Sequence, residues 1–194
     1  NLAMRVGFWP LLLIGLALTA CARLPTPQGW SGGVVVEDVT YREDVYERVL
    51  YIGTQEGDLR ALVAEDQAGL SASSCRLPRR CNGGELLWRY VLRGEVENDL
   101  AIYGTPVVAG ETIFFASYHG FLYSLGLDGE ELWDTKIGEA DNIVGGVAVA
   151  DNMVLVGSDD GHMYAFEYDF AANDGDLRWR FPTGGEVWST PAVQ

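Results

Sequence analysis

Short apolar runs separated by turn residues recur along most of the chain. The runs are rich in Val, Ile, Phe and Tyr, and turn signals such as Asp-Gly, His-Gly and Ala-Gly-Glu divide them at intervals of roughly 8–12 residues. Apolar residues often occupy consecutive positions, as in residues 113–115 (IFF) and 154–156 (VLV), which is typical of strands buried on both faces. No stretch beyond residue 30 has a helical period. The pattern predicts an all-β domain.

One four-part segment recurs in the chain. Each copy contains an opening apolar element, two apolar runs joined by a turn with glycine, and a final element ending near a tryptophan. The turn glycines Gly120 and Gly161 lie 41 residues apart, and Trp88, Trp133 and Trp179 lie 45 and 46 residues apart. In the second unit the strands are expected at residues 105–109, 112–117, 121–127 and 130–136. Four-stranded units with a period of roughly 40–45 residues are the sequence signature of a β-propeller.

The repeats predict antiparallel four-stranded blades arranged in an open arc. We expect three complete blades, at about residues 30–103, 104–144 and 145–188, and the start of a fourth at 189–194. Because propellers close with about four to eight blades, three cannot complete a ring. We therefore expect a partial propeller, truncated at its C-terminus, with at least one apolar blade face uncovered.

The residues of the repeat are more specific than its period. Residues 122–133 (LYSLGLDGEELW) resemble the repeat of pyrroloquinoline-quinone-type (PQQ-like) propellers, and the resemblance covers about residues 30–194. In that family the late tryptophan of each blade docks between neighbouring blades. The resemblance implies this structural role for Trp88, Trp133 and Trp179.

The first thirty residues predict an export signal and a tether. A basic start precedes an apolar run at residues 6–17, which is short for a bilayer span of about 20 residues and typical of a signal peptide. Residues 18–21 (LTAC) resemble the lipobox of bacterial lipoproteins, which implies removal of residues 1–20 and lipid on Cys21; an ordinary signal peptide with an incidental Cys21 is the alternative. Residues 21–29, with two prolines, form an expected tether. The domain would then lie outside the cytoplasm, anchored to the outer membrane or cell surface.

The first unit carries an insertion that contains the other two cysteines and a basic cluster. Because an exported compartment favours disulfides, we expect a bridge between Cys75 and Cys81; the alternative metal site would need more soft ligands than two cysteines. The only basic cluster of the acidic domain is a candidate contact patch for an acidic partner or lipid head groups, with a solvated loop as the alternative. Its residues are Arg76, Arg79 and Arg80.

Charge and motifs exclude several classes of protein. The chain has 28 Asp and Glu against 13 Lys and Arg, for a formal charge of −15, which argues against nucleic-acid binding. A hydrophobic content of 48% argues against disorder. His119 and His162 lie at turns, outside any Ser/His/Asp or HExxH motif. Residues 169–176 (DFAANDGD) resemble a calcium loop only superficially, because Phe170 stands where the first carboxylate is required. No metal site is expected.

Two functions remain open after these exclusions. Lipid-anchored PQQ-like propellers include the BamB-type factors, which help to assemble β-barrel proteins in outer membranes. This resemblance implies a non-catalytic scaffold that binds other proteins at the membrane surface. The alternative is a fragment of a quinoprotein dehydrogenase, which resembles the same repeat and holds PQQ and Ca²⁺ in its central funnel. Such enzymes often have a disulfide between adjacent cysteines near the cofactor, whereas the pair here is spaced Cys-x5-Cys, so a scaffold without a cofactor is the prediction.

Overall fold

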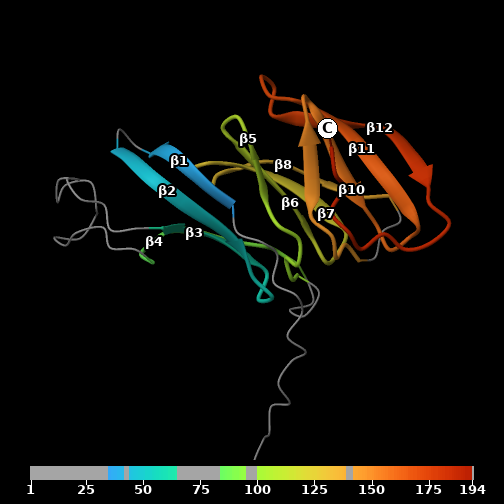
Figure 1. Ribbon diagram of the computed structural model, residues 1–194, viewed down its shortest axis with the longest axis horizontal. Coiled ribbons are helices and arrows are strands. Elements are labelled where there is room, and N and C mark those ends of the chain that lie inside the picture. Colours follow the sequence, from blue (N-terminus) through green and yellow to red (C-terminus); the bar gives the residue numbers. More distant parts are fainter. Residues whose placement is uncertain (1–34, 42–43, 65–83, 95–99, 139–141, 194) are drawn as a thin grey trace, which may run out of the picture.

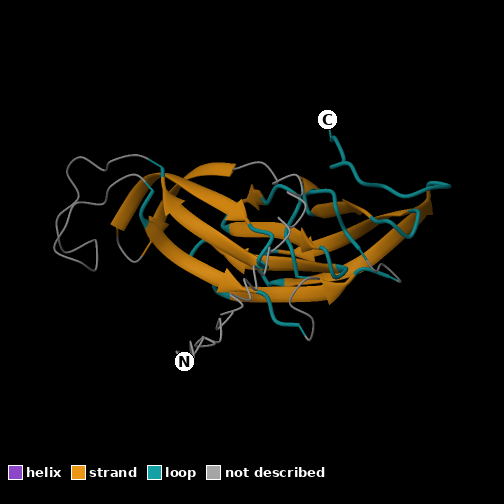
Figure 2. Cartoon of the chain, turned by 90° about the horizontal axis from the view of Figure 1, so that it is seen from below, coloured by secondary structure: helices purple, strands orange, loops and turns teal. Residues whose placement is uncertain are grey.

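The computed structural model describes residues 35–41, 44–64, 84–94, 100–138 and 142–193. These residues form three four-stranded sheets that stand side by side in an open fan (Figure 1). Strands and loops make up the whole of this described part, as Figure 2 shows. The predicted all-β class and the open propeller are confirmed.

Each sheet is a meander in which every strand pairs antiparallel with the next strand of the chain. The first sheet contains β1 (Val35–Tyr41), β2 (Asp44–Gly53), β3 (Asp58–Val63) and β4 (Leu86–Val91). The second contains β5 (Val107–Ala109), β6 (Thr112–Ser117), β7 (Phe121–Gly126) and β8 (Glu131–Lys136). The third contains β9 (Val147–Ala150), β10 (Met153–Gly157), β11 (His162–Asp169) and β12 (Asp174–Pro182). The first strands lie together, because β5 contacts both β1 and β9.

The first sheet differs from the others in a longer opening hairpin. The charged residues 37–47 are compatible in sequence with either a loop or a long hairpin. The structure has the hairpin, in which Val39 pairs with Tyr46 and Tyr41 with Asp44 after a bulge. The first strand therefore continues to Tyr41, beyond the opening apolar element at 30–35. Charged residues are compatible with this hairpin, because antiparallel strands pair through backbone atoms alone.

Two apolar cores fill the spaces between the three sheets. We call the face of a sheet that points to the preceding sheet its leading face, and the opposite one its trailing face. The first core joins the trailing face of the first sheet to the leading face of the second, through Tyr51, Leu59 and Ala61 against Ile113, Phe115 and Leu125. The second core joins Phe114 and Leu122 to Val154, Val156 and Phe166. All six residues of β6 are buried because this strand serves both cores, and each large side chain contributes roughly 1.5–3 kcal/mol.

The same glycine turn joins the second and third strands of every sheet. Its glycine adopts a positive φ of 79°, 84° and 80° at Gly57, Gly120 and Gly161, a conformation that L-residues with a side chain rarely adopt. In each turn the glycine N–H donates to the carbonyl oxygen three residues earlier, namely that of Thr54, Ser117 and Ser158. The repeat detected in the sequence is thus a repeat of backbone geometry.

Candidate functional site

The first predicted docking tryptophan lies between the first two sheets. The Trp88 indole N–H donates to the carbonyl oxygen of Leu127 at 2.9 Å. Its ring covers Gly129, where a Cβ atom would approach the indole to 2.7 Å, and the ring of Tyr51 lies 5.7 Å away. Beside it, the Tyr90 hydroxyl donates to Glu131. The pKa of Tyr90 is raised well above its usual value, mainly because the hydroxyl is buried and also because it bonds to the Glu131 carboxylate.

The other two predicted docking tryptophans have different surroundings. Trp133 lies between the second and third sheets, with its ring centroid 6.0 Å from that of Phe166 and 5.9 Å from that of Tyr168. A Cβ atom on Gly175 would lie 3.0 Å from the Trp133 ring. Trp179 occupies the same position in the third sheet, yet it is 46% exposed. Two of the three therefore contact a following sheet, and the third lies on an uncovered face.

The linker between successive sheets is held by the glycine turns on both sides of it. The Ile102 N–H donates to the Thr54 carbonyl of the first sheet at 2.9 Å, and the Ala101 carbonyl accepts from the Tyr118 N–H of the second at 2.7 Å. The third linker repeats the first contact, from the Val187 N–H to the Ser158 carbonyl, and in the second linker the Ile143 N–H donates to the Tyr118 carbonyl, one residue further along its turn. Sequence reasoning missed these anchors, although a signal existed, because Ile102, Ile143 and Val187 each stand two residues before the start of a repeat.

The backbones that open each unit are crowded together beside these linkers. A Cβ atom on Gly145 would lie 2.8 Å from the carbonyl oxygen of Ser189. The Gly146 N–H donates to Thr190 Oγ1 at 3.0 Å. Residues 189–190 therefore lie beside the segment that leads into β9. That segment lies in the same way beside Gly104, at the start of the second unit.

A buried carboxylate anchors the glycine turn of the first sheet. Asp58 is fully buried and accepts hydrogen bonds from the hydroxyl of Thr54 and from the guanidinium groups of Arg60, at 2.9 Å, and Arg89. Burial raises the pKa of Asp58, but the bonds from Arg60, Thr54 and Arg89 outweigh it, so the pKa lies below its usual value. Sequence reasoning missed this cluster, because Arg60 and Arg89 become neighbours only through the register of β3 and β4.

Replacing this carboxylate by an amide (Asp58→Asn) is expected to lower the free energy of unfolding by about 2 kcal/mol at neutral pH, because two cations lose their partner. Because the pKa of Asp58 is lower in the folded than in the unfolded chain, its negative charge stabilises the fold above about pH 4. This stabilisation is lost as the pH falls through the pKa of Asp58 in the folded protein. Urea unfolding at neutral and acid pH should therefore show a difference that disappears in acid. The exposed Asp151, whose φ of 54° suits asparagine, provides Asp151→Asn as the matched control; an equal loss in both variants would contradict the role of Asp58.

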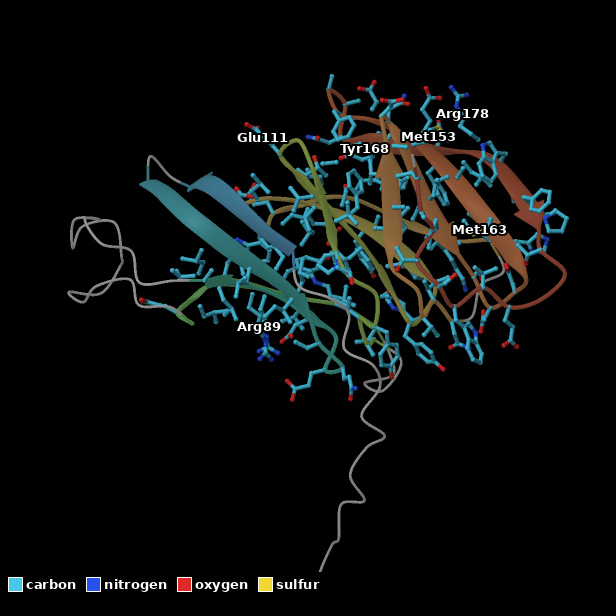
Figure 3. All side chains as sticks on the ribbon, in the orientation of Figure 1. Arg89, Glu111, Met153, Met163, Tyr168 and Arg178 are labelled. Carbon is cyan, nitrogen blue, oxygen red and sulfur yellow. The ribbon has the colours of Figure 1, made fainter. Side chains whose placement is uncertain are left out.

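An open groove of about 560 Å³ lies at the β11–β12 end of the third sheet. Three of its acidic residues accept hydrogen bonds within the chain: Glu167 from Asn152 at 2.9 Å and from Arg178, Asp169 from the Ala171 N–H, and Asp174 from the Gly175 N–H. Figure 3 shows Arg178 at this end of the fan and Arg89 at the opposite end. Within the described ranges, no three His, Cys, Asp or Glu side chains gather closely enough to hold a metal ion.

The remaining residues singled out in the sequence form two groups, of which only the two histidines lie within the described residues. His119 packs in its turn, stacked on Phe121 with centroids 4.7 Å apart, and His162 lies 3.3 Å from an oxygen of Asp160. The lipidation site, the disulfide and the basic patch lie outside the described residues: Cys21, Cys75, Cys81, Arg76, Arg79 and Arg80. In the part of the chain that is described, no helix has the length and apolar character required to cross a membrane.

Three meandering sheets with their first strands together define the class of this protein as an open β-propeller. The WD40 domain of Pan2 from Neurospora crassa matches 84% of this chain with 42% of its own, at a TM-score of 0.56 and 12% identity. A europium-containing methanol dehydrogenase matches 78% of this chain with 26% of its own, at a TM-score of 0.50 and 17% identity. At such identities the likeness is one of fold alone.

Sequence comparison narrows this class to one kind of repeat. The family model described as outer membrane protein assembly factor BamB matches residues 120–194. BamB from Salmonella typhimurium is 31% identical over 97 residues, which are 45% of this chain and 24% of that protein. The chain thus spans about a quarter of the length of the curated relatives that it matches. Residues 120–194 of this open propeller are thus similar to BamB.

Proposed function

We propose that this chain forms part of a membrane-anchored, extracytoplasmic propeller that binds other proteins as a scaffold and catalyses no reaction. The observation that carries the proposal is the match of residues 120–194 to BamB, whose name describes a factor for outer membrane protein assembly. The matched segment contains one complete glycine turn, two of the three predicted docking tryptophans, Trp133 and Trp179, and the linker at Val187. It therefore includes the features that set the blades side by side.

The construction of the fan supports a scaffold because it makes the blades rigid and leaves their ends free. Linkers bonded at both sides and two continuous apolar cores fix each blade against the next. Loops presented by such a frame are suited to recognition, since binding does not have to order the frame itself. The net charge of −15 favours encounter with basic surfaces on a partner.

The proposed anchor rests on the lipobox-like residues 18–21. Lipid on Cys21 would hold the propeller at the membrane through the tether at 21–29, since more than one acyl chain gives stable anchoring. The name of the BamB relatives places their work at the outer membrane. A scaffold held at that surface meets its protein partners there.

Cross-linking in membranes of a bacterium with two membranes tests the proposal. We expect the chain to sediment with the outer membrane and to cross-link to proteins that assemble β-barrels, while the Cys21→Ser variant becomes soluble and loses these cross-links. The double variant Arg79→Ala with Arg80→Ala tests the basic patch independently of the anchor. It should weaken the cross-links to partner proteins while the chain stays at the membrane. A soluble wild-type chain, or cross-links that include no assembly protein, would contradict the scaffold.

Absorbance spectroscopy with added PQQ and Ca²⁺ tests the quinoprotein alternative. The likeness to methanol dehydrogenase is one of fold, and the Cys-x5-Cys spacing of Cys75 and Cys81 differs from the adjacent cysteine pair of quinoprotein dehydrogenases. We therefore expect no stoichiometric uptake of PQQ. Uptake of one PQQ per chain together with alcohol oxidation would overturn the scaffold in favour of a dehydrogenase.

A further inference from the structure

Three aspartates of the chain are each followed by a glycine, namely Asp128, Asp160 and Asp174. At such a pair the amide nitrogen of the glycine can attack the carboxyl carbon of the aspartate, because the glycine has no side chain that shields the nitrogen. The product is a five-membered cyclic imide, a succinimide, which water opens to aspartate or to isoaspartate. The reaction requires that the fold holds the two atoms close together.

The pair Asp128–Gly129 is protected by the turn between β7 and β8. The Gly129 N–H donates to the Gly126 carbonyl at 2.9 Å. The Asp128 carboxylate accepts from the Glu130 N–H at 3.1 Å, and the Trp88 ring covers Gly129. The nitrogen and the carboxylate are therefore bonded to different partners, although the Asp128 side chain is exposed.

The pair Asp160–Gly161 is protected in the same way by its glycine turn. The Gly161 N–H donates to the Ser158 carbonyl at 3.4 Å. The Asp160 carboxylate accepts from the His162 N–H at 3.0 Å and from the Tyr164 hydroxyl at 2.6 Å. Here too the two groups that would have to react are bonded to other parts of the chain.

The pair Asp174–Gly175 has the opposite geometry. The Gly175 N–H donates to Asp174 Oδ1 at 2.8 Å, so the nitrogen lies beside the carboxyl carbon that bears this oxygen. Asp174 is exposed to solvent, at the end of the fan where Figure 3 labels Tyr168 and Arg178. The hydrogen bond directs the amide proton toward the oxygen atoms that the reaction must expel.

The sheet does not compete for the Gly175 N–H. Gly175 pairs with Tyr168 of β11, but the Tyr168 N–H donates to the Asn152 carbonyl on the other side of β11. Because the N–H and C=O of one strand residue point to the same side, the Tyr168 carbonyl points away from Gly175. The Gly175 N–H therefore points to the outer edge of β12, the outermost strand. This edge is the rim of the blade and not a face on which another blade packs.

We propose that Asp174 is a modification site at which the chain forms isoaspartate without an enzyme. The Gly175 nitrogen bonds to Asp174 Cγ, and its proton leaves as water together with the hydroxyl of the protonated carboxyl group. Water then adds to a carbonyl of the imide. Opening at the backbone carbonyl leaves the chain running through Cβ and Cγ, which is isoaspartate, whereas opening at Cγ restores aspartate. The reaction is not a redox step and consumes no co-reactant other than water.

Isoaspartate inserts one extra atom into the backbone at the start of β12. The change falls between the pairs Asp169–Asp174 and Tyr168–Gly175 of the hairpin, and it should disturb their pairing locally, as a β-bulge does. Asp174 also lines the open groove, so the modification moves a carboxylate at that groove.

Ageing of the full chain in a mildly acidic buffer with detergent, followed by peptide mapping, tests the proposal. Mass-spectrometric fragmentation of the backbone distinguishes isoaspartate from aspartate at each position, and enzymatic methylation of isoaspartyl groups provides a second count. We expect isoaspartate to accumulate at Asp174 at least about tenfold faster than at Asp128. Asp174→Glu keeps the charge but would need a six-membered ring, so the signal at this position should be lost. Asp128→Glu, the matched control, should leave the signal at Asp174 unchanged.

Ageing in urea separates the folded geometry from the local sequence. All three pairs are Asp-Gly, so their rates are expected to become similar once the chain is unfolded. Equal rates at Asp174 and Asp128 in the folded chain would overturn the proposal, because the fold would then make no difference. Isoaspartate that forms at Asp174 only in urea would also overturn it, because the fold would then protect this pair.

Discussion

Replacing Trp88 by alanine is expected to lower the free energy of unfolding by about 3–4 kcal/mol. The indole fills the space between β4 and the β7–β8 turn, donates to the Leu127 carbonyl and covers Gly129. Its removal leaves a cavity at a junction between two sheets and an acceptor without its donor. Chemical denaturation measures the loss.

Trp179→Ala is the matched control for this substitution. Trp179 stands at the equivalent position of β12, but its side chain is 46% exposed and, in the described chain, contacts no following sheet. The same chemical change should therefore cost less than about 1 kcal/mol in dilute solution. Trp88→Phe, which keeps most of the ring and loses the N–H donor, should fall between the two. Equal losses in the two alanine variants would show that Trp88 does not stabilise the junction.

The strand pattern of the sequence was sufficient to predict the fold because every sheet is a meander of local pairs. Strands next to each other in the chain are also neighbours in the sheet, so turn residues and apolar runs indicate the pairing directly. The run at 113–115 predicts burial on both faces, and the structure buries all of β6. Gly120 and Gly161 predict turns and adopt the positive φ that such turns use.

Contacts between sheets were harder to predict because their partners are far apart in sequence or belong to the backbone. The acceptor of Trp88 is the Leu127 carbonyl, and a carbonyl oxygen has no sequence signature. The burial of Asp58 depends on Arg89, which the insertion separates from it along the chain. An acidic residue beside a turn glycine is usually solvated, so composition alone assigns Asp58 to the surface.

The uncovered faces follow from the sequence only in part. The open arc predicts at least one exposed apolar face, and Trp179 and Phe181 lie on such a face. That Leu86 stands where the second sheet has Glu131 could be found only from the register of β4 and β8.

Replacing Gly104 by alanine is expected to cost about 3 kcal/mol of unfolding free energy. A Cβ atom there would overlap the carbonyl oxygen of Gly145 and lie 2.5 Å from the Cα of Gly146. Both neighbours are backbone atoms in the segment leading into β9, so neither can turn away as a flexible side chain could. Relief requires separating the opening segments of the second and third sheets. Because the same linker region is held by the Ile102 and Ile143 N–H bonds, we expect faster hydrogen exchange at these two amides.

Gly110 is the matched control, because a substitution there tests the conformational freedom of glycine without the steric overlap found at Gly104. Its φ is 61° and no atom lies within 4 Å of a Cβ placed on it, so Gly110→Ala costs only the strain of the left-handed conformation, about 1–2 kcal/mol. Asparagine tolerates that conformation, and Gly110→Asn should recover part of the loss. Gly104→Asn should instead be worse than Gly104→Ala, because its larger side chain meets the same backbone. If asparagine recovers stability at position 110 and lowers it further at position 104, then position 104 requires glycine because the opening segments approach closely, and not because of turn geometry. A recovery of stability by Gly104→Asn would contradict this explanation.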